Sequence, residues 1–242
     1  AKAYDYDILT SWLVLLGILS LLGASQLAIA VTNWWATLWV KPKPLPRLNF
    51  SHGIPTDSRT LVVVPTLLTN KPQIEKLLED LEVRFLANRD ENLSFGLLTD
   101  LADAQQEILP EDEGLINHAA KKIEDLNLRY GKNHNETFFL FHRPRRWNPV
   151  DKVWMGYERK RGKLSDLNHL LRGKSRESFS AIVGDERVFT TIKYIITLDT
   201  DTQLPRDAAW KLVGLMAHPM NHPVYDEKKK RLGVTKQNTT YA

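Results

Sequence analysis

The stretch KYIITLDTDTQLP, residues 193–205, joins an apolar run to two carboxylates. Five strand-favouring residues, YIITL, precede Asp199 and Asp201, and Pro205 closes the segment. This order is typical of a buried strand that ends at the rim of an α/β sheet. Two carboxylates at positions i and i+2 can face a hard divalent cation from one short turn, and such a cation usually keeps some coordination positions for substrate phosphates. The alternative is a solvated Asp-rich turn that only ends the strand.

Strand and helix patterns alternate through the chain before this stretch. Continuous apolar runs predict four strands: residues 60–65, 93–99, 137–142 and 193–198. Apolar residues at helical spacing predict the connecting helices: residues 70–88, 104–130, part of 151–172, and a further helix after 207. This order predicts an α/β fold with a mostly parallel sheet and helices on both faces, so ligands are expected at the carboxyl ends of the strands.

Two carboxylates follow the second predicted strand, in the sequence TDLADA. Asp100 stands at the strand end, where an acidic side chain can accept hydrogen bonds from a nucleotide base or ribose. The alternative for Asp100 and Asp103 is an N-cap of the next helix, and Asp100 could serve in both ways.

Residues 141–174 carry ten lysines and arginines just before the Asp-rich strand. Such cations can hold a pyrophosphate and neutralise it as a leaving group. Interleaved tryptophans also permit nucleic-acid binding by base stacking, and a solvated basic face is the third interpretation. Over the whole chain, 33 basic residues stand against 29 acidic ones, which does not by itself indicate nucleic acid.

Two motifs suggestive of metal sites are excluded or disfavoured. The chain has no Cys, which excludes disulfides and thiolate zinc sites. His218 and His222 are four residues apart, but Pro219 and Pro223 interrupt the helix that would align them. We therefore expect a structural or loop role for His218 and His222.

Residues 8–40 contain no charged side chain. Residues 8–30 suffice as a helix to cross a bilayer, and the tryptophans that follow suit its headgroup zone. Lys41, Lys43 and Arg47 then place the following domain in the cytoplasm by the positive-inside rule. The alternatives are a secretory signal peptide and a buried hairpin within a larger membrane domain.

These patterns predict four segments: a transmembrane segment (1–40), a Pro-rich connector (41–56), a soluble domain (57–227) and a polar tail (228–242). The absence of an initiator Met and the polar end suggest a piece of a longer protein.

Five motifs in this order resemble the glycosyltransferase domain (family 84) of cyclic β-1,2-glucan synthases: VVVPTLLTN, FGLLTDLADA, FHRPRRWNP, WMGYERKRGKLSDLN and YIITLDTDTQLPRDAA. The resemblance covers residues 11–226. It implies a partial, donor-binding GT-A-like nucleotide-sugar fold behind a transmembrane helix, UDP-glucose as donor, a divalent metal (Mg²⁺ or Mn²⁺), and inverting transfer to a growing glucan chain. The reaction would lie on the cytoplasmic side of a bacterial inner membrane, with no nucleic acid as partner.

The resemblance also assigns roles to residues. It implies that Pro65 and Thr66 lie beside the nucleotide, Asp100 near the uracil or ribose, and Lys163 near the pyrophosphate. Asp199 and Asp201 would bind the metal, with Asp199 also facing the donor. Metal and cations would lower the cost of charge that develops on departing UDP.

The chain departs from the family in lacking a candidate general base, which an inverting transferase needs. Only 41 residues follow Asp201, and Asp207 is expected to cap a helix. We therefore expect a donor-binding half domain that needs the remaining domains of a synthase and does not turn over alone. Two rival functions stay open: a non-catalytic nucleotide-sugar-binding or scaffold module, and a phosphohydrolase of the haloacid dehalogenase type, which requires Thr where Gln203 stands.

Overall fold

The computed structural model of the chain describes residues 2–40, 44–131, 137–174, 176–227 and 230–234. It divides into two units, residues 1–45 and 46–242. The first unit is built on one helix, α1 (Lys2–Trp39). Its segment Thr10–Trp39 is long and apolar enough to cross a membrane, judged by length and composition alone. The helix therefore continues through the tryptophans that we expected in the headgroup zone.

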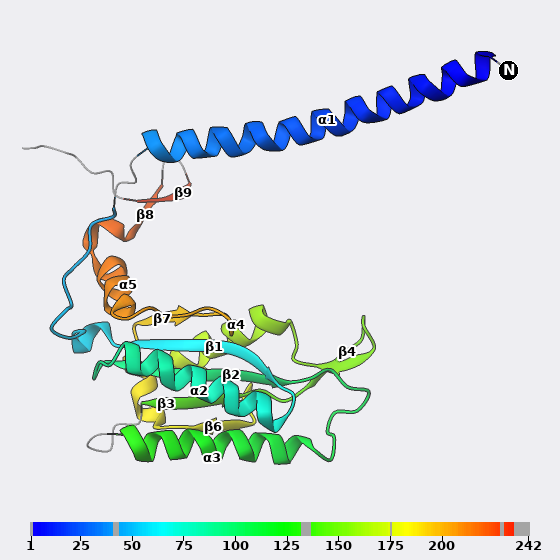
Figure 1. The fold of residues 1–242 in the computed structure, drawn as a ribbon. Helices are drawn as coiled ribbons and strands as arrows, with labels where there is room; N and C mark the ends of the chain where they lie inside the picture. The colour runs from blue at the N-terminus through cyan, green and yellow to red at the C-terminus, as the bar shows by residue number, and fades with distance from the viewer. Residues whose placement is uncertain (1, 41–43, 132–136, 175, 228–229, 235–242) are drawn as a thin grey trace, which may run out of the picture. The chain divides into compact units, whose positions relative to one another are not determined.

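The second unit is built on a five-stranded sheet in the order β6–β3–β2–β1–β7 (Figure 1). The strands are β1 (Thr60–Leu68), β2 (Leu93–Leu101), β3 (Phe138–His142), β6 (Ala181–Val183) and β7 (Tyr194–Thr197). β1, β2, β3 and β7 are parallel, which confirms the four predicted strands and the α/β class. β6 pairs antiparallel with β3, and the sequence did not indicate it.

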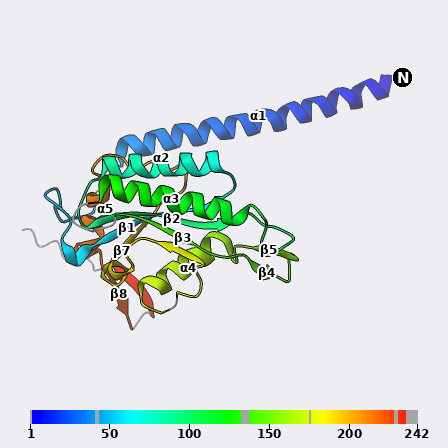
Figure 2. The ribbon, with the colours of Figure 1, turned by 90° about the horizontal axis from the view of Figure 1, so that it is seen from below.

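Helices cover both faces of this sheet, as predicted (Figure 2). α2 (Lys71–Ala87) and α3 (Asp112–Tyr130) lie on one face, and α4 (Arg159–Leu171) lies on the other. Alternate residues of β1 feed the two cores: Val62 packs on the α2–α3 side and Val63 on the α4 side. α5 (Ala208–Ala217) adds to the first core. Short 3₁₀ helices complete the set: η1 (Thr56–Ser58), η2 (Glu186–Thr191) and η3 (Pro219–Asn221).

Three helix-boundary predictions can be compared with the structure. Asn70 caps α2 as expected, because its side chain accepts a hydrogen bond from Gln73 N at 2.9 Å. α3 begins at Asp112 and not near Ala104, because Ala104 instead pairs with Trp154 in an isolated bridge. The prediction that an N-cap at Asp100 or Asp103 starts this helix is therefore wrong.

Asp207 occupies the position before α5 but makes no side-chain capping bond there, contrary to the expected cap. It adopts φ +62°, and the amide of Ala209 is instead satisfied by Asn88 Oδ1 at 3.0 Å, from the end of α2. Asn88, which is distant in sequence, thus accepts the hydrogen bond from the first turn of α5 that was expected for Asp207. His218 has the structural role expected of it, because its ring nitrogen accepts a hydrogen bond from Met220 N at 3.2 Å.

Two hairpins stand outside the main sheet: β4 (Arg146–Asn148) with β5 (Val153–Met155), and β8 (Pro223–Asp226) with β9 (Arg231–Val234). β9 falls within residues 228–242, which were predicted as a polar tail. The compact unit also begins at Pro46, inside the predicted connector, because Leu48 N bonds Gly214 O and Ile54 is buried.

The order of the parallel strands, β3–β2–β1–β7, reverses direction at β1. The chain moves outward from β1 to β3 and then returns to the other side of β1 for β7. Crevices outside the carboxyl ends of strands at such a switch point are the preferred ligand sites of open α/β sheets. The carboxyl ends of β1 and β7 are therefore the first place to look for a site.

Candidate functional site

A pocket of ≈ 400 Å³ lies at this edge of the sheet. Pro65 and Thr66 at the end of β1, Asp100 at the end of β2 and Lys163 from α4 contribute to its wall. Its volume is in the range of small-molecule sites. The structure thus brings together four of the five residues predicted to bind the donor. Asp199 does not line the pocket, but its neighbour Thr200 does.

Gly156 allows the segment between β5 and α4 to approach the end of β2. A Cβ atom at Gly156 would lie 2.2 Å from Asp100 Oδ2, so no larger residue fits without displacing that carboxylate. Gly156 follows β5 directly and leads into the first turn of α4. α4 follows this segment, and its Arg159, Lys160 and Lys163 contribute to the wall of the pocket. No pattern in the sequence indicated that this glycine belongs to the site.

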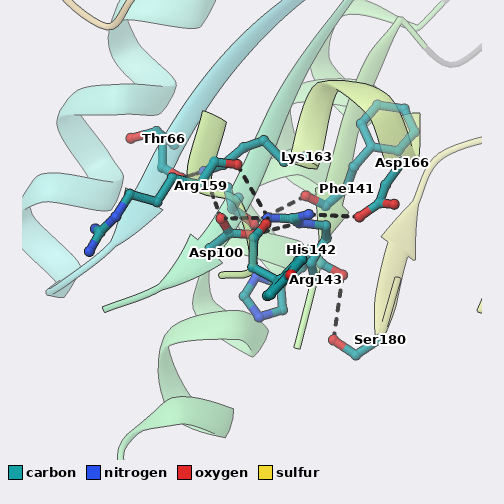
Figure 3. Close-up of polar contacts among 11 residues, drawn as sticks. Thr66, Asp100, Phe141, His142, Arg143, Arg159, Lys163, Asp166 and Ser180 are labelled. Atoms are coloured by element: carbon teal, nitrogen blue, oxygen red, sulfur yellow. Dashed lines mark hydrogen bonds and ion pairs between the residues drawn. The ribbon is translucent and has the colours of Figure 1, made fainter. Parts of the chain in front are cut away.

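Asp100 is the centre of a buried charge network (Figure 3). Arg143 donates to both of its carboxylate oxygens, at 2.9 and 3.0 Å, and Lys163 Nζ lies 3.0 Å from Oδ2. Lys163 also donates to the Thr66 carbonyl at 2.7 Å, while Arg143 reaches Asp166 at 2.6 Å. Two cations therefore face two carboxylates. This network ties together the ends of β1, β2 and β3 and the body of α4.

Burial and pairing act in opposite directions on the cations of this network. Burial lowers the pKa of Lys163, and the neighbouring Asp100 opposes that shift. Burial also opposes the charge on Arg143, but hydrogen bonds and attraction from Asp100 and Asp166 raise its pKa overall. The interpretation of residues 141–174 as a solvated basic face is therefore wrong for Arg143, Arg145 and Lys163, each of which is buried.

Two further ion pairs stand at the mouth of the pocket. Arg159 Nη2 lies 2.9 Å from Asp103 Oδ2, and Lys160 contacts Asp199. The Arg159 and Lys160 side chains are 66% and 51% exposed, in contrast to Lys163. Because they are accessible, Arg159 and Lys160 are better placed than Lys163 to meet an anionic ligand from solvent.

The Asp-rich motif after β7 forms a tight turn. Thr202 N donates to Asp199 O at 3.0 Å, which closes a turn with Asp199 first and Asp201 third. Both aspartates are exposed. Within the described residues, no group of three His, Cys, Asp or Glu side chains gathers to hold a metal. The turn offers two carboxylates, which fits a hard cation that takes its other oxygen ligands from a bound diphosphate and water.

His142 lies at the end of β3 and is completely buried. Its Nδ1 is 2.8 Å from Thr99 Oγ1, while Nε2 has no hydrogen-bond partner in the part of the chain that the structure describes. Burial lowers its pKa to about 4, although Asp100 and Asp112 favour the charged form. His142 is therefore neutral at physiological pH and supports the network without adding charge.

The sequence did not identify Gln73 as a site residue. Its side chain accepts from Thr69 N at 3.1 Å and donates to Leu67 O at 3.0 Å, which fixes the loop after β1 beside the pocket. The sequence pattern that could have indicated Gln73 is its position three residues after the Asn70 cap, which is typical of a capping box.

No family model matches the chain. It is 43% identical over 211 residues to the curated protein named Cyclic beta-(1,2)-glucan synthase NdvB of Rhizobium meliloti (strain 1021). The match covers 87% of this chain and 7% of the length of that relative. The chain therefore corresponds to a small part of the relative's length.

Proposed function

Because this chain is related to the cyclic β-1,2-glucan synthases over most of its length, we propose that it supplies the donor site of a glucosyltransferase that builds β-1,2-glucan from UDP-glucose. The relationship supports a role in glucan synthesis. The finer assignment rests on one observation: the pocket at the switch point of the sheet is lined by exposed cations and by Thr200 of the Asp199–Asp201 turn, and Lys160 of that lining pairs with Asp199. This combination suits a sugar diphosphate held with a divalent cation.

In this proposal, Pro65 and Thr66 line the nucleoside side of the pocket and Asp100 lies near the uracil or ribose. Lys163, held by Asp100 and the Thr66 carbonyl, directs positive charge toward the diphosphate. Arg159 and Lys160 add the accessible charge at the mouth. Charge-assisted contacts of this kind stabilise the negative charge that develops on a departing diphosphate.

Asp199 and Asp201 would hold Mg²⁺ or Mn²⁺ in this site. When bound, the cation would act as a Lewis acid that neutralises diphosphate oxygens. Lys160 already neutralises Asp199 in the free chain. Once Asp199 turns toward a cation, the Lys160 ammonium becomes available for a diphosphate oxygen. Lys160 thus keeps the turn compensated before the donor arrives and contacts the donor afterwards.

The catalytic base is not assigned in this proposal. Asp103 is paired with Arg159 and Asp100 is buried in its network, so neither presents a free carboxylate to an acceptor hydroxyl. We therefore propose that the chain binds donor but needs further domains of a synthase for inverting transfer to a growing glucan. We place it at the inner membrane through the apolar segment Thr10–Trp39, with the pocket in the cytoplasm.

Calorimetric titration of UDP into the full chain in detergent, with Mn²⁺ or with EDTA, tests the donor site. We expect tighter binding with Mn²⁺ and loss of that gain in Asp201→Ala. Asp125→Ala, an exposed carboxylate on α3, serves as the control and should bind as the wild type does. Metal-independent UDP binding would favour a scaffold module, and phosphate release from a model phosphomonoester would favour a hydrolase.

A further inference from the structure

Arg84 is a buried cation on the sheet-facing side of α2. It occupies a position of the apolar stripe that includes Leu77 and Leu81, and it is 1% exposed. Among the described residues no carboxylate forms an ion pair with it, and burial lowers its pKa against a weaker opposing effect of Asp80. A charged group is costly to bury unless hydrogen bonds compensate it. Its hydrogen-bond partners therefore indicate why an arginine stands there.

Those partners are backbone carbonyls of the Asp-rich turn. Arg84 Nη2 donates to Thr200 O at 2.8 Å and to Thr202 O at 3.0 Å, and Nε donates to Thr202 O at 3.2 Å. The planar guanidinium thus spans two carbonyls, which a lysine ammonium on a flexible stem does less well.

The two carbonyls stand on either side of Asp201. The Thr200 carbonyl belongs to the peptide bond between Thr200 and Asp201. The Thr202 carbonyl belongs to the residue directly after Asp201. Thr202 N also donates to Asp199 O, so a hydrogen bond within the turn closes it. The Arg84 guanidinium adds hydrogen bonds to two carbonyls of the same turn. These contacts fix the backbone from which both carboxylates project.

We infer that Arg84 is a positioning residue for the divalent cation: it holds the Asp199–Asp201 turn in the arrangement that binds metal and thereby couples metal to nucleotide binding. This inference rests on the proposed role of Asp199 and Asp201. In this inference Arg84 itself contacts neither the cation nor the nucleotide. Residues of this kind, which orient metal ligands from behind, typically account for 10–100-fold in metal affinity.

Asn88 allows a matched comparison. It is the C-cap residue directly after α2, is also buried, and donates to the Arg84 carbonyl at 3.2 Å. It also holds the chain that follows β7, through Leu204 O at 3.2 Å and Ala209 N at 3.0 Å. It does not contact the carbonyls beside Asp201. If Arg84 only fastens the chain after β7 to α2, as Asn88 does, the Arg84 and Asn88 variants should behave alike.

The test compares Arg84→Met and Asn88→Ala in the full chain in detergent. The first readout is the gain in UDP affinity with Mn²⁺ over EDTA. Arg84→Met should lower this gain about tenfold, with UDP affinity in EDTA unchanged. Asn88→Ala should keep the gain close to that of the wild type. The second readout is hydrogen–deuterium exchange in EDTA, which should rise at residues 199–203 in Arg84→Met and only beyond residue 203 in Asn88→Ala.

The other outcomes of this test separate failure of the Arg84 inference from failure of the proposed metal site. An unchanged gain in Arg84→Met, or equal losses in Arg84→Met and Asn88→Ala, overturns the inference. If Arg84→Met does not fold, Arg84→Lys takes its place, and a gain equal to that of the wild type again overturns it. If the wild type shows no metal-dependent gain, the proposed metal site fails, while exchange at residues 199–203 still decides whether Arg84 holds the turn.

Discussion

Lys163 Nζ lies 3.0 Å from Asp100 Oδ2, and the two side chains are only 5% and 2% exposed. Asp100 is also the bidentate partner of Arg143. One carboxylate therefore compensates two buried cations, while each cation has at least one further acceptor: Thr66 O for Lys163 and Asp166 for Arg143. The network is accordingly asymmetric, and Asp100 is its least replaceable member.

This asymmetry predicts the order of two destabilising effects. Asp100→Asn leaves two cations without their shared carboxylate and should lower the free energy of unfolding by about 3–5 kcal/mol. Lys163→Met removes one cation and its desolvation penalty together, so its loss should be about 1–2 kcal/mol. Urea unfolding of the full chain in detergent measures both values. Equal losses would show that Asp100 does not serve both cations.

Gly156→Ala should disturb the pocket through a steric clash. The added methyl group would lie 2.2 Å from Asp100 Oδ2, and overpacking of this kind costs about 1–3 kcal/mol. Gly114→Ala is the matched control, because Gly114 lies in α3 with nothing within 4 Å of its Cβ position. Alanine there should be neutral or stabilising. Thermal unfolding checks both, and a Gly156→Ala midpoint equal to that of Gly114→Ala contradicts the clash.

The four parallel strands are predictable because a strand buried on both faces reads as a continuous apolar run. β6 escapes prediction because its three residues are only half-buried and are held by pairing with β3, a contact without a periodic signal. The start of α3 is misplaced for a similar reason. Ala104 suits a helix by propensity but is held in an extended bridge by Trp154.

The residues of the site likewise fall into two groups: those that a local sequence pattern predicts and those that depend on contacts distant in sequence. Strand ends identify Thr66, Asp100 and the Asp-rich turn, because the carboxyl ends of parallel strands meet at one edge. The role of Arg84 could not be predicted, because its carbonyl partners lie 116 and 118 residues further along the chain. A single cation in an apolar helical stripe does not indicate by itself which residues it contacts. The burial of Lys163 is not predictable from the sequence pattern either, because its partners, Asp100 and the Thr66 carbonyl, lie far away along the chain.

Lys160 should affect metal and nucleotide in opposite directions. It pairs with Asp199 in the free chain, so Lys160→Met should free that carboxylate and strengthen Mn²⁺ binding without nucleotide. The same change removes a cation from the mouth of the pocket and should weaken UDP binding by about 10–100-fold, since a hydrogen bond to a charged group contributes about 1.5–3 kcal/mol. Calorimetry with each ligand alone and with both measures the two effects.

Arg161→Met provides the control for Lys160→Met. Arg161 is 81% exposed, pairs with Glu158 and does not line the pocket, so its loss changes the net charge equally without touching the site. Both ligands should bind this variant as they bind the wild type. If Arg161→Met weakens UDP binding as much as Lys160→Met does, the effect belongs to overall charge and not to the position of Lys160.

His142 should make the folded chain sensitive to acid. Burial lowers its pKa from 6.5 to about 4, so between these two values the unfolded chain binds more protons than the folded chain. Stability must then rise with pH through this window and fall as pH drops from 6.5 toward 4. A shift of this size corresponds to roughly 3 kcal/mol at the acidic end. Asp100, Asp112, Lys163 and Arg145 face the ring, and their effects are included in this shift.

His142→Phe tests this assignment, because phenylalanine fills a similar volume and cannot titrate. Thr99 Oγ1 keeps its other partner, the Phe141 carbonyl at 3.2 Å, so the substitution need not leave that hydroxyl unsatisfied. Urea unfolding of both chains at several pH values should give a steep decline below pH 6.5 for the wild type and a shallower one for His142→Phe. Parallel curves would assign the acid sensitivity to the carboxylates and not to this buried imidazole.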